Sequence, residues 1–327
     1  LAPQLYAHHK FDGKQFSFGL QRMLWGFFKK LVIADRAIIA INTVLDGYYD
    51  FSGTTLTFTI LLYALQLYTD FSGGIDISRG VSQILGVELT QNFRRPYFAT
   101  TINDYWRRWH ISLGAWMKEY VFYPLALSKT FTGAGKKIKT SKFGASKMGA
   151  HVAKVLPTSF ASLIVFFLVG VWHGANWTFI LWGVLYGVII IFEKLLDLPK
   201  RLPKFKVASI AYQIFTLLAV MIGWVLFRAE SLGSALHYLK TMFGLAGAPL
   251  VDAAAIFNLR EYILPLIMGL LCSTPIFRII RQKASQKSVA FYNVYELLSG
   301  LGQIILFLVG ISYLVINAHN PFIYFNF

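Results

Sequence analysis

The sequence predicts an all-α polytopic membrane protein, and three observations support that prediction. Hydrophobic residues make up 56% of the 327 residues and charged residues only 14%, whereas soluble globular chains carry roughly 25% charged residues. The mean hydropathy is +0.55. Several apolar runs approach the ~20 residues that a helix needs to cross a bilayer, and short basic segments separate them. This pattern excludes an ordinary soluble enzyme and a disordered chain.

The first elements of the chain combine apolar and charged residues. Residues 15–41 are apolar but carry five charged side chains, so we expect one or two amphipathic helices at the membrane surface. Residues 56–71 form the first expected span. Gly73 and Gly74 follow it, and they predict a helix break within or near the membrane.

Further apolar runs predict spans at residues 156–171, 177–196, 207–227, 262–280 and 297–316. The first two of these form a close pair around a short polar break at His173. No repeat of fixed period is visible along the chain. We therefore expect residues 1–327 to form a single membrane-embedded domain.

Basic segments connect the spans at residues 128–154, 197–206 and 278–287. In the first segment, glycine and lysine are frequent between residues 132 and 149, and we expect a flexible loop there. If it is cytoplasmic and each span crosses once, the other two are cytoplasmic as well, as the positive-inside rule requires. This distribution explains the net charge of 31 − 15 = +16 without a nucleic-acid partner, because a nucleic-acid site needs basic residues gathered on one surface.

The sequence carries none of the common catalytic or metal-binding patterns. It has no G-x-S-x-G elbow, no P-loop and no C-x-x-C pair. His8 and His9 are adjacent and cannot face one ion from a regular helix, and Cys272 stands alone in an apolar run. We therefore expect no bound metal.

His173 is one of two histidines within dense aromatic and apolar sequence. An ionisable group at membrane depth is costly and is by default a functional candidate. A neutral imidazole can also take up a proton near neutral pH. Trp172 and Trp177 flank His173. The alternative is a polar hairpin tip at the interface with two tryptophans of an aromatic belt, and the residues alone leave both interpretations open.

His110 is the second such histidine. Helical spacing would place Asn103, Arg107 and His110 on one face, at positions i, i+4 and i+7. Asp104 could then pair with Arg108. For this segment alone, the favoured interpretation is an interfacial helix with belt tryptophans and snorkelling arginines.

Two carboxylates, Asp70 and Asp76, stand close to the Gly-Gly pair, with Ser72 between them. An interrupted helix there would line a wet cavity or lie buried in protein. Paired carboxylates could carry out acid–base chemistry. The alternative is that Ser72 or Asp76 caps a helix.

These segments, in this order, resemble the membrane-bound O-acyltransferase (MBOAT) family. The resembling residues are Tyr-Thr-Asp-Phe-Ser-Gly at 68–73, Asn-Phe-Arg-Arg-Pro-Tyr at 92–97, Asp-Tyr-Trp-Arg-Arg-Trp-His-Ile-Ser-Leu at 104–113, Trp-His-Gly-Ala at 172–175, and the stretches 29–36 and 321–325. The resemblance extends over nearly the whole chain, and the two histidine-containing blocks are its specific part. It is greatest to the bacterial branch that acts in alginate O-acetylation and in D-alanylation of teichoic acid.

The resemblance implies a multi-helix bundle with interfacial and broken helices around a central cavity. A cytosolic thioester and an acceptor hydroxyl would meet in that cavity. It implies that His173 is catalytic, as the general base on the hydroxyl, and it implicates His110 as a second catalytic residue. The residues expected at the substrates are Asp70, Ser72, Asn103, Arg107, Trp109 and Trp172. Family members begin with further membrane helices, so we expect this chain to be the C-terminal portion of one.

The expected function is acetyl transfer in the bacterial inner membrane. The donor would be acetyl-coenzyme A or another acyl thioester acting as a co-substrate, with no bound cofactor. The acceptor would be an extracytoplasmic polysaccharide, reached directly or through an extracytoplasmic acyltransferase partner protein. D-alanyl transfer from a carrier protein to teichoic acid is the alternative within the same chemistry. A transporter or channel lined by Asp70, Asp76 and His173, and a scaffold for a partner acyltransferase, are alternatives of other classes.

Overall fold

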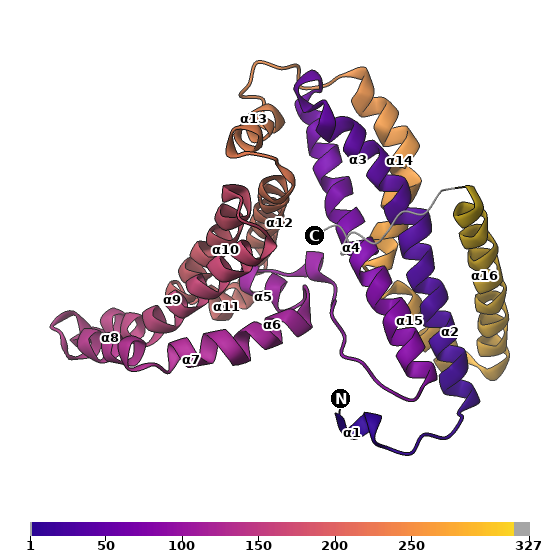
Figure 1. Cartoon of the computed structure of the whole chain (residues 1–327), viewed down its shortest axis with the longest axis horizontal. Coiled ribbons are helices and arrows are strands. Elements are labelled where there is room, and N and C mark those ends of the chain that lie inside the picture. The colour runs from indigo at the N-terminus through magenta and orange to yellow at the C-terminus, as the bar shows by residue number, and fades with distance from the viewer. Residues whose placement is uncertain (1, 317–327) are drawn as a thin grey trace. The chain divides into compact units, whose positions relative to one another are not determined.

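The computed structural model describes residues 2–316, and the regular elements among them are all helical (Figure 1). This confirms the all-α prediction. The chain divides into two compact units. Unit 1 comprises Leu1–Thr90 and Thr241–Phe327, and unit 2 comprises Gln91–Lys240. The expectation of a single domain stays a prediction. Residues 321–325 of the family resemblance lie outside the described residues.

Unit 1 combines long helices with short ones. Its elements are α1 (Ala2–Leu5), α2 (Gly13–Phe27), the π-helix η1 (Phe28–Ala34), α3 (Asp35–Asp46), η2 (Tyr48–Asp50), α4 (Gly53–Ile84), α14 (Ala253–Cys272), α15 (Ile276–Lys287) and α16 (Val289–Ile316). Helix α13 (Leu232–Met242) leads into its second part.

Unit 2 combines short helices with three long ones. Its elements are η3 (Pro96–Phe98), α5 (Ile102–Trp106), α6 (Ile111–Met117), η4 (Lys118–Phe122), α7 (Tyr123–Ala126), α8 (Lys129–Thr140), η5 (Phe143–Ala145), α9 (Lys147–His173), α10 (Trp177–Leu195), α11 (Leu198–Arg201), η6 (Leu202–Lys204) and α12 (Lys206–Arg228).

Five helices among the described residues are long and apolar enough to cross a bilayer: α9, α10, α12, α14 and α16. They correspond to the five spans predicted from residue 156 onward, although one of these is displaced. The predicted span 262–280 is wrong at both ends, because the helix is Ala253–Cys272 and the basic helix α15 follows it. The predicted span 56–71 lies inside α4, which is not among the five. Its threonines, Gln66 and Asp70 lower the hydropathy of that run.

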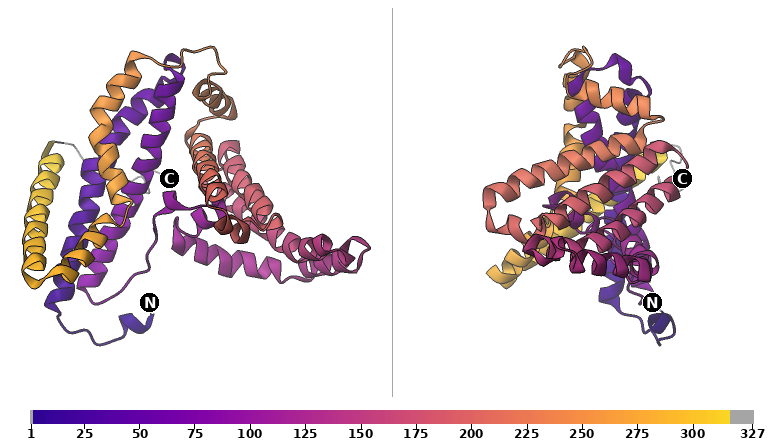
Figure 2. Two further views of the ribbon diagram at one scale, coloured as in Figure 1. Left: turned by 180° about the vertical axis from the view of Figure 1, so that it is seen from behind. Right: turned by 90° about the vertical axis from the view of Figure 1, so that its left-hand side faces the viewer.

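Glycine contacts hold α2 against α4, which lie side by side in both figures (Figures 1 and 2). Gly26 faces Gly73, and two turns away Gly19 faces Gly80. A Cβ atom on Gly26 would lie 2.6 Å from the carbonyl oxygen of Gly73, and one on Gly80 would lie 2.6 Å from that of Gly19. The predicted helix break at Gly73 is therefore wrong. Helix α4 runs unbroken from Gly53 to Ile84, because these glycines serve close helix packing instead.

The charged residues of α2, η1 and α3 were expected at a membrane surface, and for three of them this is wrong. The stretch forms a continuous helical run with a π-helical segment at its centre. Lys29, Lys30 and Asp35 are buried within unit 1. The physical reason is that each finds an oppositely charged partner there, so burial does not leave the charge unpaired.

Hydrogen bonds to Asp252 connect the N-terminal end of α4 to that of α14. Its carboxylate accepts hydrogen bonds from the Ser52 N–H at 2.7 Å and the Thr55 hydroxyl at 2.6 Å. It also caps α14 by accepting from the Ala255 N–H at 2.7 Å. One side chain thus satisfies polar groups at two helix starts, which fixes where the two helices meet.

The basic segments are helical, so the flexible loop expected at residues 132–149 is wrong. Helix α8 occupies Lys129–Thr140, and α9 begins at Lys147 after an N-cap bond from the Gly149 N–H to Ser146. A Cβ atom on Gly135 of α8 would lie 2.9 Å from the Ala153 carbonyl oxygen of α9. The seven lysines between residues 128 and 154 are exposed. Tight packing on α9 thus orders a segment whose glycine content suggested mobility.

Substituting Gly26 by alanine should destabilise unit 1. The new methyl group would meet the backbone of Gly73 and Ile77 within 3 Å, and overpacking of this kind costs about 1–3 kcal/mol. Gly300 of α16 is the matched control, because nothing lies within 4 Å of its Cβ position. Thermal unfolding in lipid nanodiscs should give a lower Tm for Gly26→Ala than for Gly300→Ala. Equal Tm values would contradict the close crossing.

Candidate active site

The segment that carries His110 is not one continuous helix. Helix α5 ends at Trp106, and α6 begins at Ile111. His110 lies between them in the left-handed conformation, with φ of 47°. The expected helical face of Asn103, Arg107 and His110 is therefore wrong, because this conformation turns the chain. The expected Asp104–Arg108 ion pair is confirmed at 2.8 Å.

Asn92 fixes the orientation of the His110 ring. The Oδ1 atom of Asn92 accepts from the Ser112 N–H at 3.0 Å and from the Ser112 hydroxyl at 2.6 Å. A backbone N–H can only donate, so this amide atom is the oxygen. The same oxygen lies 3.2 Å from His110 Nδ1, so Nδ1 carries a hydrogen and donates it. In the neutral ring, Nε2 is then the nitrogen with the lone pair.

Burial keeps the His110 ring neutral. The residue lies outside the five spanning helices, and loss of hydration lowers the pKa of His110 to about 4. At pH 7 the imidazole is therefore uncharged, with Nε2 able to accept a proton or a hydrogen bond.

His173 ends helix α9 at a tight hairpin. Gly174 follows it with φ of +152°, a conformation that L side chains rarely adopt. Asn176 then starts α10 by accepting from the Thr178 N–H. The imidazole packs against aromatic rings on two other helices, with centroid distances of 5.2 Å to Trp182 on α10 and 5.0 Å to Phe227 on α12.

Aromatic contacts bring the two histidine segments together. Trp106 packs edge-on against Trp182 at 5.5 Å and Tyr186 at 5.0 Å, and Trp109 lies 5.3 Å from Trp224 on α12. We call these rings the aromatic cluster: Trp106, Trp109, Trp182, Tyr186, Trp224 and Phe227. His173 contacts Trp182 and Phe227 of this cluster, and His110 directly follows its member Trp109. The two histidines thus belong to one site of unit 2.

The remaining expected substrate residues of unit 2 differ in exposure. Trp109 is buried in the aromatic cluster, whereas Trp172 is 54% exposed. Arg107 is exposed and Asn103 is half-buried. Their contact with a substrate stays a prediction.

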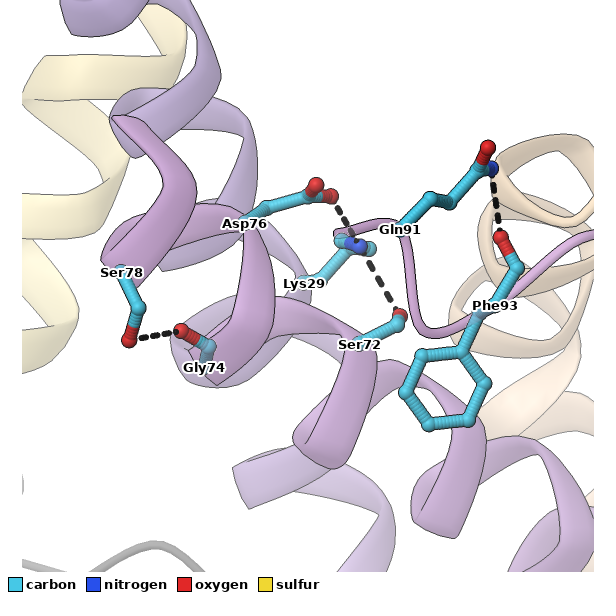
Figure 3. Close-up of polar contacts among 7 residues, drawn as sticks. All are labelled: Lys29, Ser72, Gly74, Asp76, Ser78, Gln91 and Phe93. Carbon is cyan, nitrogen blue, oxygen red and sulfur yellow. Dashed lines mark hydrogen bonds and ion pairs between the residues drawn. The ribbon is translucent and has the colours of Figure 1, made fainter. Parts of the chain in front are cut away.

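Asp70 and Ser72 belong to unit 1, where lysines of η1 bind them. Figure 3 shows Lys29 between Ser72 and Asp76. Lys29 Nζ lies 2.6 Å from Asp76 and donates to Ser72 at 2.9 Å. Lys30 Nζ lies 2.8 Å from Asp35 and 3.1 Å from Asp70.

We call these residues the ion cluster: Lys29, Lys30, Asp35, Asp70, Ser72 and Asp76. Its members on α4 lie in the middle of the helix, so the capping alternative is wrong. Their observed contacts join α4 to η1, and a role in substrate binding stays a prediction.

Glu193 is a residue of this site that the sequence analysis did not single out. It is fully buried on α10 and binds the backbone at the start of α5, at Ile102 and Asn103. The signal was present, because a carboxylate within the apolar run 177–196 is expensive in a membrane and needs a partner. Its partner could not be named, since α5 lies some 90 residues away in sequence.

Metal binding finds no support in the described part of the chain. No group of three or more histidine, cysteine, aspartate or glutamate side chains among those residues could hold an ion.

Removing the Asp70 carboxylate should destabilise the protein. Asp70 is 1% exposed and shares Lys30 with Asp35, so Asp70→Asn leaves a buried charge with one partner fewer. We expect a loss of about 1–3 kcal/mol, measured as a lower Tm in nanodiscs. Asp197→Asn is the control, because its pair with Lys200 is exposed and such pairs contribute little. A Tm for Asp70→Asn equal to that of the control would contradict a structural role.

His110 should make the protein less stable in acid. Its pKa falls from 6.5 to about 4 on folding, so between these values the unfolded chain binds more protons than the folded one. Stability is therefore lost as the pH falls from 6.5 to 4, by up to about 3 kcal/mol. Tm values between pH 7 and pH 4 should fall more steeply for the wild type than for His110→Asn. If Tm depends on pH in the same way in both proteins, His110 is not buried in its neutral form.

Comparison with known proteins identifies the family of this chain. The family model of MBOAT, the membrane-bound O-acyltransferase family, matches residues 7–146 and 148–235. The peptidoglycan O-acetyltransferase of Helicobacter pylori is 31% identical over 313 residues, which cover 92% of this chain and 55% of that protein. The probable alginate O-acetylase AlgI of Pseudomonas putida is 29% identical over 333 residues, covering 96% and 61%.

A third relative transfers a different group. The teichoic acid D-alanyltransferase of Bacillus subtilis is 28% identical over 224 residues, which cover 65% of this chain and 51% of that protein. The chain thus spans between half and two thirds of the length of these relatives. The family model covers both histidine segments, most of unit 2 and the N-terminal part of unit 1. The chain is a multi-pass membrane protein that belongs to the membrane-bound O-acyltransferase family.

Proposed function

We propose that this chain carries the catalytic site of an O-acyltransferase that moves an acetyl group from a thioester to a polysaccharide hydroxyl. One observation carries the proposal. Two histidines from distant segments adjoin one aromatic cluster, because His173 packs on Trp182 and Phe227 and His110 directly follows Trp109, in a chain of an O-acyltransferase family. Acyl transfer from a thioester needs such a base, because a neutral hydroxyl is a weak nucleophile.

His173 is proposed as the general base. Its imidazole takes the proton of the acceptor hydroxyl while the hydroxyl oxygen attacks the thioester carbonyl. A tetrahedral intermediate forms, the C–S bond breaks, and the leaving thiolate takes the proton from the imidazolium. A positioned base of this kind contributes about 10²–10⁴-fold to the rate. The rings of Trp182 and Phe227 beside the imidazole would limit access of water, which competes with the acceptor for the thioester.

His110 is proposed as the second catalytic residue. Asn92 binds its Nδ1 side, so Nε2 would accept a hydrogen bond from the acceptor and orient it. Asn103 or Arg107 is proposed to stabilise the oxyanion of the intermediate, with Trp109 and Trp172 at the substrates. Asp70 and Ser72 would act at the substrates only if the ion cluster opens to them.

The proposed orientation places the basic segments in the cytoplasm of a bacterial cell. Helix α9 then runs outward from Lys147 to His173, over 27 residues or about 40 Å. The donor, acetyl-coenzyme A or another acyl thioester, enters from the cytosol. The acceptor polysaccharide lies outside the inner membrane and is reached directly or through a partner acyltransferase. The names of the peptidoglycan and alginate relatives support this acceptor class.

D-alanyl transfer from a carrier protein is the second candidate, because of the Bacillus relative. The two candidates share the acid–base step and differ in donor. A channel is less well supported, since the carboxylates Asp70 and Asp76 are paired with lysines.

Replacing His173 by alanine should abolish acyl transfer and leave the fold intact. The measurement is release of free thiol from acetyl-coenzyme A by the full-length protein in nanodiscs, with a crude cell-envelope glycan as acceptor. We expect acceptor-dependent release in the wild type and a loss of at least about 100-fold in His173→Ala.

His151→Ala is the matched control for this experiment. His151 stands on the same helix, where its ring lies 3.2 Å from the Lys194 carbonyl oxygen, so its loss should leave transfer near the wild-type rate. Equal release by His173→Ala and the wild type would refute the proposed base. Absence of release from acetyl-coenzyme A, together with transfer from a D-alanyl carrier protein, would select the second candidate.

A further inference from the structure

Glu193 is a buried carboxylate inside a helix that is long and apolar enough to span the membrane. Its exposed fraction is 0%, and it lies near the C-terminal end of α10. A carboxylate moved from water into such surroundings costs several kcal/mol unless hydrogen bonds compensate it. The hydrogen-bond partners of Glu193 therefore indicate its structural role.

The donors around Glu193 come mainly from the backbone of another segment. One carboxylate oxygen accepts from the Ile102 N–H at 2.6 Å and the other from the Asn103 N–H at 2.9 Å. The Tyr212 hydroxyl of α12 donates to the first oxygen at 3.3 Å. Both oxygens thus act as acceptors, as an ionised carboxylate requires.

These bonds complete the start of helix α5. A helix begins with N–H groups that have no partner within the helix. Glu193 binds the first two in α5, and the Thr101 hydroxyl accepts from the third, of Asp104. The fourth, of Tyr105, donates to the Thr101 carbonyl oxygen at 2.8 Å. Without Glu193, two buried donors would lose their acceptors where lipid offers none.

Helix α5 lies along α10, between Glu193 and the histidine site. Its start binds Glu193, and its last residue, Trp106, packs on Trp182, eleven residues earlier in α10. Eleven helical residues span about 16 Å. The imidazole of His173 contacts the same Trp182 ring. The segment from Ile102 to His110 thus lies beside a span, with Glu193 at one end and the two histidines at the other.

We propose that Glu193 is a positioning residue for acyl transfer, which sets the place of His110 by binding the backbone N–H groups at the start of α5. Helix α5 has five residues, and an isolated helix of this length is unstable. Its position therefore depends on anchors at its ends. Asn92 anchors the segment after it, at His110 and Ser112, and Glu193 anchors its beginning. This role depends on the function proposed above.

The test compares two substitutions at neighbouring residues. Glu193→Gln keeps the shape but turns an NH₂ group toward a backbone N–H. Lys194→Gln, the matched control, also replaces a long charged side chain of α10, but Lys194 Nζ donates to Ser162 on α9. Glu193→Asp is a further variant that keeps the charge and shortens the reach by one methylene. It replaces Glu193→Gln if that protein does not fold.

Hydrogen exchange of the full-length protein in nanodiscs is the first measurement, and it needs no activity. Peptides covering residues 99–112 should exchange at least ~10-fold faster in Glu193→Gln than in the wild type or Lys194→Gln. Unchanged exchange in this segment would overturn the proposed anchor. This result stands even if the protein transfers no acyl group from any donor tested, so it is separate from failure of the proposed function.

Kinetics is the second measurement, made with whichever thioester the protein accepts. Glu193→Gln should lower kcat by about 10- to 100-fold with little change in KM, because a misplacement near 1 Å can cost 10²-fold. Combined with His110→Asn, it should lower kcat no further than His110→Asn alone. If the reductions in kcat multiply in the double variant, Glu193 does not act through His110. A wild-type kcat in Glu193→Gln despite faster exchange would also overturn this role.

Discussion

The candidate site of unit 2 depends on the packing of Trp106 against Trp182 and Tyr186. This contact joins an irregular segment to a regular helical hairpin, and it does so with rings that lose little conformational freedom when they pack. The same Trp182 ring supports His173. A single indole therefore relates the positions of two histidines that are more than 60 residues apart in the sequence.

Both units contain buried polar groups whose desolvation is unfavourable, and each unit compensates for it with different interactions. In unit 1 the lysines of η1 pair with carboxylates of α3 and α4, so charge neutralises charge. In unit 2 the carboxylate of Glu193 meets neutral backbone donors. The first arrangement joins two long helical runs, whereas the second holds a helix of only five residues, because it supplies acceptors that a bilayer lacks.

Apolar run length predicted most of the spanning helices, since crossing a bilayer imposes a simple requirement on a sequence. Predictions from local sequence patterns failed where contact with a distant segment determines the backbone conformation. Gly73 looked like a helix break, but α2 packs on it and α4 continues. His110 looked helical by spacing, but its left-handed backbone is held by Asn92, 18 residues earlier. The family resemblance selected both histidines. Glu193 was detectable as a carboxylate in an apolar run, but its partner at the start of α5 is identified only by the structure.

The unequal lengths of α9 and α10 relate the site to the thickness of the membrane. At about 40 Å, the 27 residues of α9 exceed the ~30 Å of a typical hydrocarbon core, whereas the 19 residues of α10 match it. The excess of α9 is accommodated by tilt or by extension into the headgroups at its lysine-bearing end, where α8 packs beside it. Thicker or thinner lipids would then change the tilt of the hairpin, and with it the depth of His173 in the bilayer.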